Sequence, residues 1–128
     1  MGFHPQEIET AIRNDLPVIY VVLCDRQWGM VKINQHFALR PVKTLIKKTL
    51  PEEETINTDL GEIRFDKLAE SMGAFGVVVN HNDELKPALE KAIASGKAAV
   101  VHVNVDSVKH MWAPGLKTFK EMHLEPKG

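Results

Sequence analysis

The chain has 128 residues, of which 44% are hydrophobic and 26% charged, which is ordinary for one globular domain with a single hydrophobic core. Its formal net charge of -1 argues against nucleic acid as the main partner, because phosphate binding usually needs a basic surface. No apolar run reaches the roughly 18 residues of a membrane span, and no signal peptide pattern opens the chain. With one cysteine no internal disulfide can form, which agrees with a reducing compartment. Together with the absence of a membrane span and of a signal peptide pattern, this leads us to expect a cytoplasmic protein that does not bind membranes.

The first predicted helix follows His4-Pro5 and ends near Asn14, because a proline in the first turn and an asparagine before a later proline mark the two ends of a helix. A continuous apolar run comes next, from Val18 to Leu23. Such a run, without alternation of polar and apolar residues, is typical of a parallel strand buried on both faces.

A polar stretch, Cys24 to Gln27, separates this strand from a predicted helix that runs from about Trp28 to Ala38. The apolar positions of the helix are Met30, Ile33 and Phe37, and its exposed side is predicted to carry Lys32, Gln35 and Arg40. Ligands of open α/β sheets bind beyond the carboxyl ends of the strands. The stretch from Cys24 to Met30 is therefore the first candidate site.

Residues 39–62 show no clear periodicity and contain a basic run followed by the acidic run Glu52 to Glu54. Adjacent runs of opposite charge usually mark a solvated surface. The alternative is a segment that closes over a site, as long loops of compact domains often do.

The second half of the chain returns to regular patterns. In chain order we predict a helix at 65–72 ended by Gly73, a strand at 76–79, a helix from the N-cap Asp83 to Gly96, and a strand at 98–105. The buried stripe of the helix that begins at Asp83 is predicted to consist of Leu85, Leu89 and Ile93. Alternating helices and strands predict an α/β fold, namely a three-layer Rossmann-like parallel sheet with helices on both faces.

The stretch from Leu16 to Met30, LPVIYVVLCDRQWGM, resembles the second half of the cofactor signature of thiamine diphosphate (ThDP) enzymes of the acetolactate synthase type, in which a strand ends in Asn-Asn and Gly-Met follows. The stretches HPQEIETAIRNDLPVI, FDKLAESMGAFGVVV and DELKPALEKAIASGKAAVVHVNVD resemble the rest of the same domain. The resemblance implies that residues 1–106 form a partial C-terminal ThDP-binding domain. Residues 107–128 would be a tail packed on that domain.

The resemblance also implies a site. Asp25 would be a ligand of Mg²⁺, and Gln27 would offer its backbone carbonyl to the same ion. Gly29 and Met30 would lie close to the diphosphate of ThDP, where backbone N–H groups and the helix dipole favour anions. No catalytic residue is assigned, because the glutamate that activates the cofactor in this family belongs to a different domain.

Two departures from the family pattern shape the expected function. Cys24-Asp25 stands where the family has Asn-Asn, although a hard cation accepts carboxylate and amide oxygens alike. The family's upstream Gly-Asp-Gly turn, whose aspartate also binds the metal, would fall before Met1. We therefore expect an incomplete ThDP- and Mg²⁺-binding domain of a carboligase or decarboxylase acting on 2-oxo acids, inactive alone. It would need the upstream strand and a pyrimidine-binding domain or subunit, and would form a homo-oligomer.

Two alternatives stay open. The chain could be a non-catalytic remnant or subunit that acts as an interaction module. It could also derive from a sulfoacetaldehyde acetyltransferase-like enzyme, which the letters RQWG, Lys32 and Asn34-Gln35 resemble.

Overall fold

The computed structural model describes residues 4–39, 42, 46 and 55–108. The elements, in chain order, are α1 (Glu7–Arg13), β1 (Ile19–Cys24), α2 (Gly29–Leu39), α4 (Phe65–Ser71), β2 (Phe75–Val79), α5 (Asn82–Ala94) and β3 (Ala99–Asn104). The chain divides into two compact units: a sheet unit of residues 1–24 and 62–105, and a loop unit of residues 25–61 and 106–128. Among the described residues, no helix has the length and apolar character needed to cross a membrane.

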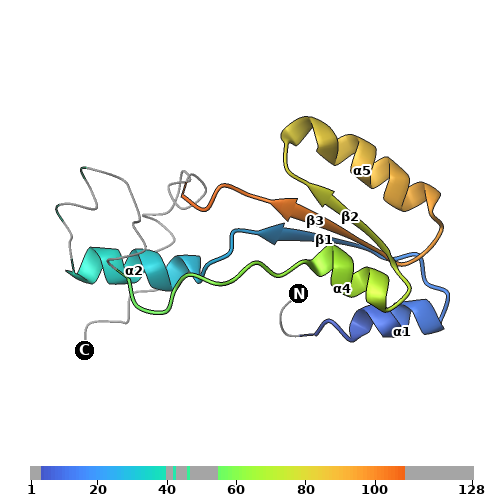
Figure 1. Cartoon of the computed structure of the whole chain (residues 1–128), viewed down its shortest axis with the longest axis horizontal. Helices are drawn as coiled ribbons and strands as arrows, with labels where there is room; N and C mark the ends of the chain where they lie inside the picture. Colours follow the sequence, from blue (N-terminus) through green and yellow to red (C-terminus); the bar gives the residue numbers. More distant parts are fainter. Residues whose placement is uncertain (1–3, 40–41, 43–45, 47–54, 109–128) are drawn as a thin grey trace, which may run out of the picture. The chain divides into compact units, whose positions relative to one another are not determined.

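The sheet unit is a parallel sheet with the strand order β1-β3-β2. Helix α5 covers one face of this sheet, and α1 and α4 cover the other (Figure 1). Residues on one strand alternate between the two faces, so Val100 packs with the α1 and α4 side and Val101 with the α5 side. The predicted three-layer α/β arrangement with helices on both faces is confirmed.

Two clusters of small and branched side chains form the core of the sheet unit. One contains Ile8, Ala11, Ala69, Ala74, Ala98 and Val100, and the other contains Val79, Ala88, Ala92, Ala99 and Val101. The central strand β3 contributes to both clusters, and its residues Ala99 to His102 are buried. A strand covered on both faces has no solvent side, which is why its sequence does not alternate.

The prediction that the first strand is buried on both faces is wrong. Val21 is 48% exposed and Leu23 is 69% exposed. The reason is that β1 lies at an edge of the described sheet, beside β3, while α5 packs on β2 and β3, so that among the described residues no helix covers the face of β1 that carries Val21 and Leu23. An apolar run therefore identified the strand correctly but not its position in the sheet.

The ends of α5 also differ from the sequence expectation. The N-cap is His81 rather than Asp83, and the carboxylate of Glu84 accepts hydrogen bonds from the backbone N–H groups of Asn80 (2.7 Å) and His81 (3.1 Å). These two donors lower the pKa of Glu84. Ile93, predicted to be buried, is 67% exposed.

Two other predictions fall largely on residues that the structure does not describe. The basic and acidic runs between residues 43 and 54 lie outside the described residues, as does the tail from residue 109 onward. The division into a domain at 1–106 and a packed tail at 107–128 therefore stays a prediction.

Candidate functional site

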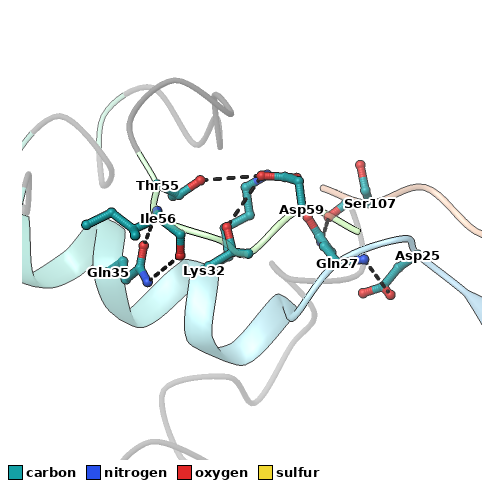
Figure 2. A network of polar contacts seen from close by, with 9 residues as sticks. Asp25, Gln27, Lys32, Gln35, Thr55, Ile56, Asp59 and Ser107 are labelled. Atoms are coloured by element: carbon teal, nitrogen blue, oxygen red, sulfur yellow. Dashed lines mark hydrogen bonds and ion pairs between the residues drawn. The ribbon is translucent and has the colours of Figure 1, made fainter. Parts of the chain in front are cut away.

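The four residues predicted to bind the metal and the diphosphate all lie in the loop unit, directly after β1. Asp25 and Gln27 belong to the loop, and Gly29 and Met30 open α2. Gln27 is buried, and Met30 is 39% exposed. Figure 2 shows the carboxylate of Asp25 beside the backbone of Gln27.

A tight turn brings Asp25 and Gln27 together. The Oδ1 atom of Asp25 accepts a long hydrogen bond of 3.4 Å from the Gln27 backbone N–H, as aspartate does in turns. Between them, Arg26 has a positive φ of 56°, a left-handed conformation that costs a residue with a side chain about 1–2 kcal/mol. Strain of this kind persists only where surrounding contacts maintain it, and it often occurs at binding sites.

An antiparallel bridge between Gln27 and Asp59 supplies those contacts. The Trp28 backbone N–H donates to the Thr58 carbonyl (2.7 Å), and the Leu60 N–H donates to the Arg26 carbonyl (2.8 Å). Because these bonds flank the bridged residue, the N–H and C=O of Gln27 itself point away from residues 58–60. Within the part of the chain that the structure describes, no hydrogen bond is formed to the backbone carbonyl of Gln27, the predicted metal ligand.

The beginning of α2 has the character of an anion site. Helix α2 has eleven residues and no acidic side chain in its first turn. The N–H of Trp28 is used by the bridge, whereas no hydrogen bond from the N–H groups of Gly29 or Met30 is formed within the described residues. Free N–H groups at the positive end of a helix dipole favour a phosphate.

Two charged residues of this region were missed by the sequence analysis. Lys32, predicted to be exposed, is only 2% exposed, and its ammonium forms an ion pair with the carboxylate of Asp59. Helical spacing places a lysine on the solvent side by default, and nothing in the sequence indicates a partner 27 positions away. Gln35 is partly buried rather than exposed, and Arg40 lies outside the described residues.

A second polar cluster lies in the sheet unit, at the carboxyl ends of β2 and β3. Asn104 donates through Nδ2 to the Oδ1 atom of Asn80 (2.8 Å), so its own Oδ1 accepts from Nε2 of the fully buried His102 (3.1 Å). The Nδ1 atom of His102 has no partner in the part of the chain that the structure describes. The ring lies 5.8 Å, between centroids, from that of Phe65.

The family model "Thiamine pyrophosphate enzyme, C-terminal TPP binding domain" matches residues 1–103. A sulfoacetaldehyde acetyltransferase of Alcaligenes xylosoxydans xylosoxydans is 35% identical over 106 residues, which cover 80% of this chain and 16% of that protein. A probable acetolactate synthase of Mycobacterium bovis is 32% identical over 105 residues, covering 82% of this chain and 17% of that protein.

A solved structure has the same fold. The crystal structure of benzoylformate decarboxylase from Polynucleobacter necessarius matches with a TM-score of 0.60 and 24% identity, covering 82% of this chain and 18% of that chain. This likeness concerns the fold alone. The present chain thus spans about a sixth of the length of the relatives that it matches.

Proposed function

Because the chain belongs to the family of C-terminal TPP-binding domains of thiamine pyrophosphate enzymes, we propose that its loop unit binds the diphosphate of ThDP through Mg²⁺. In this proposal Asp25 supplies a carboxylate oxygen and Gln27 its backbone carbonyl to the ion. Gly29 and Met30 supply N–H groups to the diphosphate.

The observation that carries the proposal is that the Gln27 carbonyl is directed away from residues 58–60, while the Asp25 carboxylate lies next to the Gln27 backbone N–H. Both groups are oxygen ligands, which Mg²⁺ prefers. Mg²⁺ is usually held by one or two carboxylates together with substrate phosphates and water, so two protein ligands are enough to begin a site. The N–H groups of Gly29 and Met30, which form no hydrogen bond among the described residues, would share the remaining charge of the diphosphate.

When bound, ThDP supplies the nucleophilic carbon for making or breaking carbon–carbon bonds next to a carbonyl. The residues of this chain would bind and orient the diphosphate end. By analogy with the acetolactate synthase and sulfoacetaldehyde acetyltransferase that it resembles, we propose a transferase or lyase that acts on 2-oxo acids or related carbonyl compounds. We also propose a cytoplasmic location, as expected from the single cysteine.

The reaction would need further protein. The chain spans about a sixth of its relatives' length, and no residue of the loop unit is assigned the activation of the cofactor ring. The open edge of β1, with Val21 and Leu23 exposed, favours pairing with another domain, subunit or copy of this chain. The same edge supports the alternative function, an interaction module without catalysis.

Titration calorimetry of ThDP into the purified protein, with and without Mg²⁺, tests the proposal. We expect binding that requires Mg²⁺ and is weakened about tenfold or more by Asp25→Ala, because an oxygen ligand of the ion is lost. Asp25→Asn should retain most of the affinity, since the amide oxygen is also a hard ligand. The control is Glu90→Ala, which removes an exposed carboxylate on α5.

Two results would contradict the proposal. The wild-type protein could bind no ThDP in the presence of Mg²⁺, which would favour the interaction module. Alternatively, Asp25→Ala and Glu90→Ala could bind equally well, which would remove Asp25 from the site.

A further inference from the structure

The feature that the proposed function leaves unexplained is the buried ion pair between Lys32 and Asp59. The side chain of Lys32 is 3% exposed and that of Asp59 is 30% exposed, whereas the ion pairs on α1, α4 and α5 that join helical neighbours are largely exposed. Exposed pairs contribute little to stability, but a lysine removed from water must keep a counter-charge. The position of Asp59 is therefore tied to that of α2.

Asp59 lies within a short segment, residues 55–60, that contacts α2 and the candidate loop at several points (Figure 2). Gln35 accepts a hydrogen bond from the Ile56 N–H (2.8 Å) and donates to the Ile56 carbonyl (3.2 Å). The Gln35 amide thus satisfies both the N–H and the C=O of Ile56, as a paired residue of a neighbouring strand would. Hydroxyl groups of Thr55 and Thr58 lie 3.4 Å from the second oxygen of Asp59.

The far end of the 55–60 segment forms the bridge that orients the candidate loop. The backbone of Thr58 and Leu60 hydrogen-bonds Trp28 and Arg26, one residue on each side of Gln27. Asp59 stands opposite Gln27 in this bridge, while its side chain turns to Lys32. The ion pair therefore fixes the register in which the segment meets the loop.

From this arrangement, and resting on the proposed function, we propose that Lys32 and Asp59 are positioning residues for the Mg²⁺ and diphosphate site. They touch neither the ion nor the cofactor in this proposal. By holding the 55–60 segment against α2, they keep Arg26 in its strained conformation and the Gln27 carbonyl directed away from residues 58–60 before any ligand binds. Partners of this kind typically change metal affinity about 10- to 100-fold when they are removed.

The test uses the full chain and three variants: Lys32→Met, which keeps the length of the side chain, Asp59→Asn, which keeps its shape, and the double variant. The control is Lys67→Met, which breaks an exposed ion pair with Glu70 on α4. The first measurement is amide hydrogen exchange at Trp28 and Leu60. The second is the Mg²⁺-dependent affinity for ThDP by calorimetry.

We expect each single variant to speed exchange at both amides, because the segment around Asp59 is no longer held to α2. Asp59→Asn should have the larger effect, about tenfold or more, because it leaves the Lys32 ammonium buried without a counter-charge, whereas Lys32→Met leaves a carboxylate that is 30% exposed. We expect ThDP affinity to fall about 10- to 100-fold. The double variant should lose no more affinity than the worse single variant, because the two residues act as one unit. Lys67→Met should change neither quantity.

Each contrary result has a distinct meaning. Unchanged exchange at Trp28 and Leu60 would overturn the inference, whatever the affinity. Faster exchange with an affinity within about twofold of wild type would show that the ion pair organises the segment without serving the site, and would also overturn it. A wild-type protein that binds no ThDP would refute the proposed function, and the exchange data alone would then decide whether the ion pair orders the loop.

Discussion

Gly76→Ala is expected to destabilise the sheet unit, because β2 and α4 meet there at backbone distance. A Cβ added at Gly76 would lie 2.4 Å from the Asp66 carbonyl oxygen, and 3.0 Å from its carbonyl carbon and from Cγ of Glu70. Real Cβ atoms essentially never lie closer than 3.0 Å to another heavy atom of this kind. Relief of the 2.4 Å contact therefore requires α4 and β2 to separate by at least about 0.6 Å. The nearest atom is backbone, and a rotamer change cannot relieve the contact.

The expected magnitude follows from two opposing effects. Overpacking a tight core costs about 1–3 kcal/mol, and the rigid neighbour places this case in the upper half of that range. Alanine also restricts the unfolded chain, which stabilises by about 0.4–1 kcal/mol. The net loss in free energy of unfolding should be about 1–2.6 kcal/mol.

Gly61→Ala is the matched control. A Cβ at Gly61 would meet nothing within 4 Å, and Gly61 is not among the positive-φ glycines of the described chain. It should therefore leave stability unchanged or raise it slightly. Urea unfolding followed by circular dichroism gives the difference, and amide exchange in β3 assigns it to the sheet unit. Equal stability of the two variants would refute the close packing of β2 on α4.

Two further predictions concern the sheet unit. The guanidinium of Arg64 donates hydrogen bonds of 2.8 and 2.6 Å to the nearly buried Asp66 carboxyl and holds the pKa of that carboxyl below its usual value. The ion pair therefore stabilises the fold above the unfolded-state pKa of Asp66, and this stabilisation is lost as the pH falls through the folded-state pKa. Arg64→Leu should therefore lower the free energy of unfolding at pH 7 but much less near pH 3, as urea titrations at several pH values would reveal; a loss independent of pH would contradict this reasoning. Leu23→Lys, at the edge of β1, should reduce self-association in sedimentation experiments, whereas Ile93→Lys, at a similarly exposed position on α5, should not. Equal sedimentation of the two variants would argue against pairing through β1.

Much of the architecture could be read from local patterns. The apolar run from Val18 to Leu23 and the helical spacing after Gly29 predict a strand, a loop and a helix, and the structure has β1 and α2 there within one or two residues. These features depend on neighbours in the chain, which is why a single sequence reveals them. The names of the candidate ligands, Asp25 and Gln27, came from the resemblance to ThDP enzymes and not from periodicity.

Other properties depend on contacts between distant residues. The sequence does not reveal that β3 lies in the centre of the sheet, and so Leu23 was expected to be buried although β1 is an edge strand. Burial of a strand face depends on the strands and helices that pair and pack with it. An edge strand and a central strand can nevertheless have the same apolar sequence.

The candidate site divides in the same way. The sequence by itself determined where the loop lies and which oxygen atoms are candidate ligands. Only the tertiary structure decided how these atoms are directed. Lys32 is buried in an ion pair with Asp59, and the segment around Asp59 forms the bridge to Gln27. Helical spacing assigns a lysine to water unless a counter-charge meets it, and that counter-charge is brought close only when the chain folds.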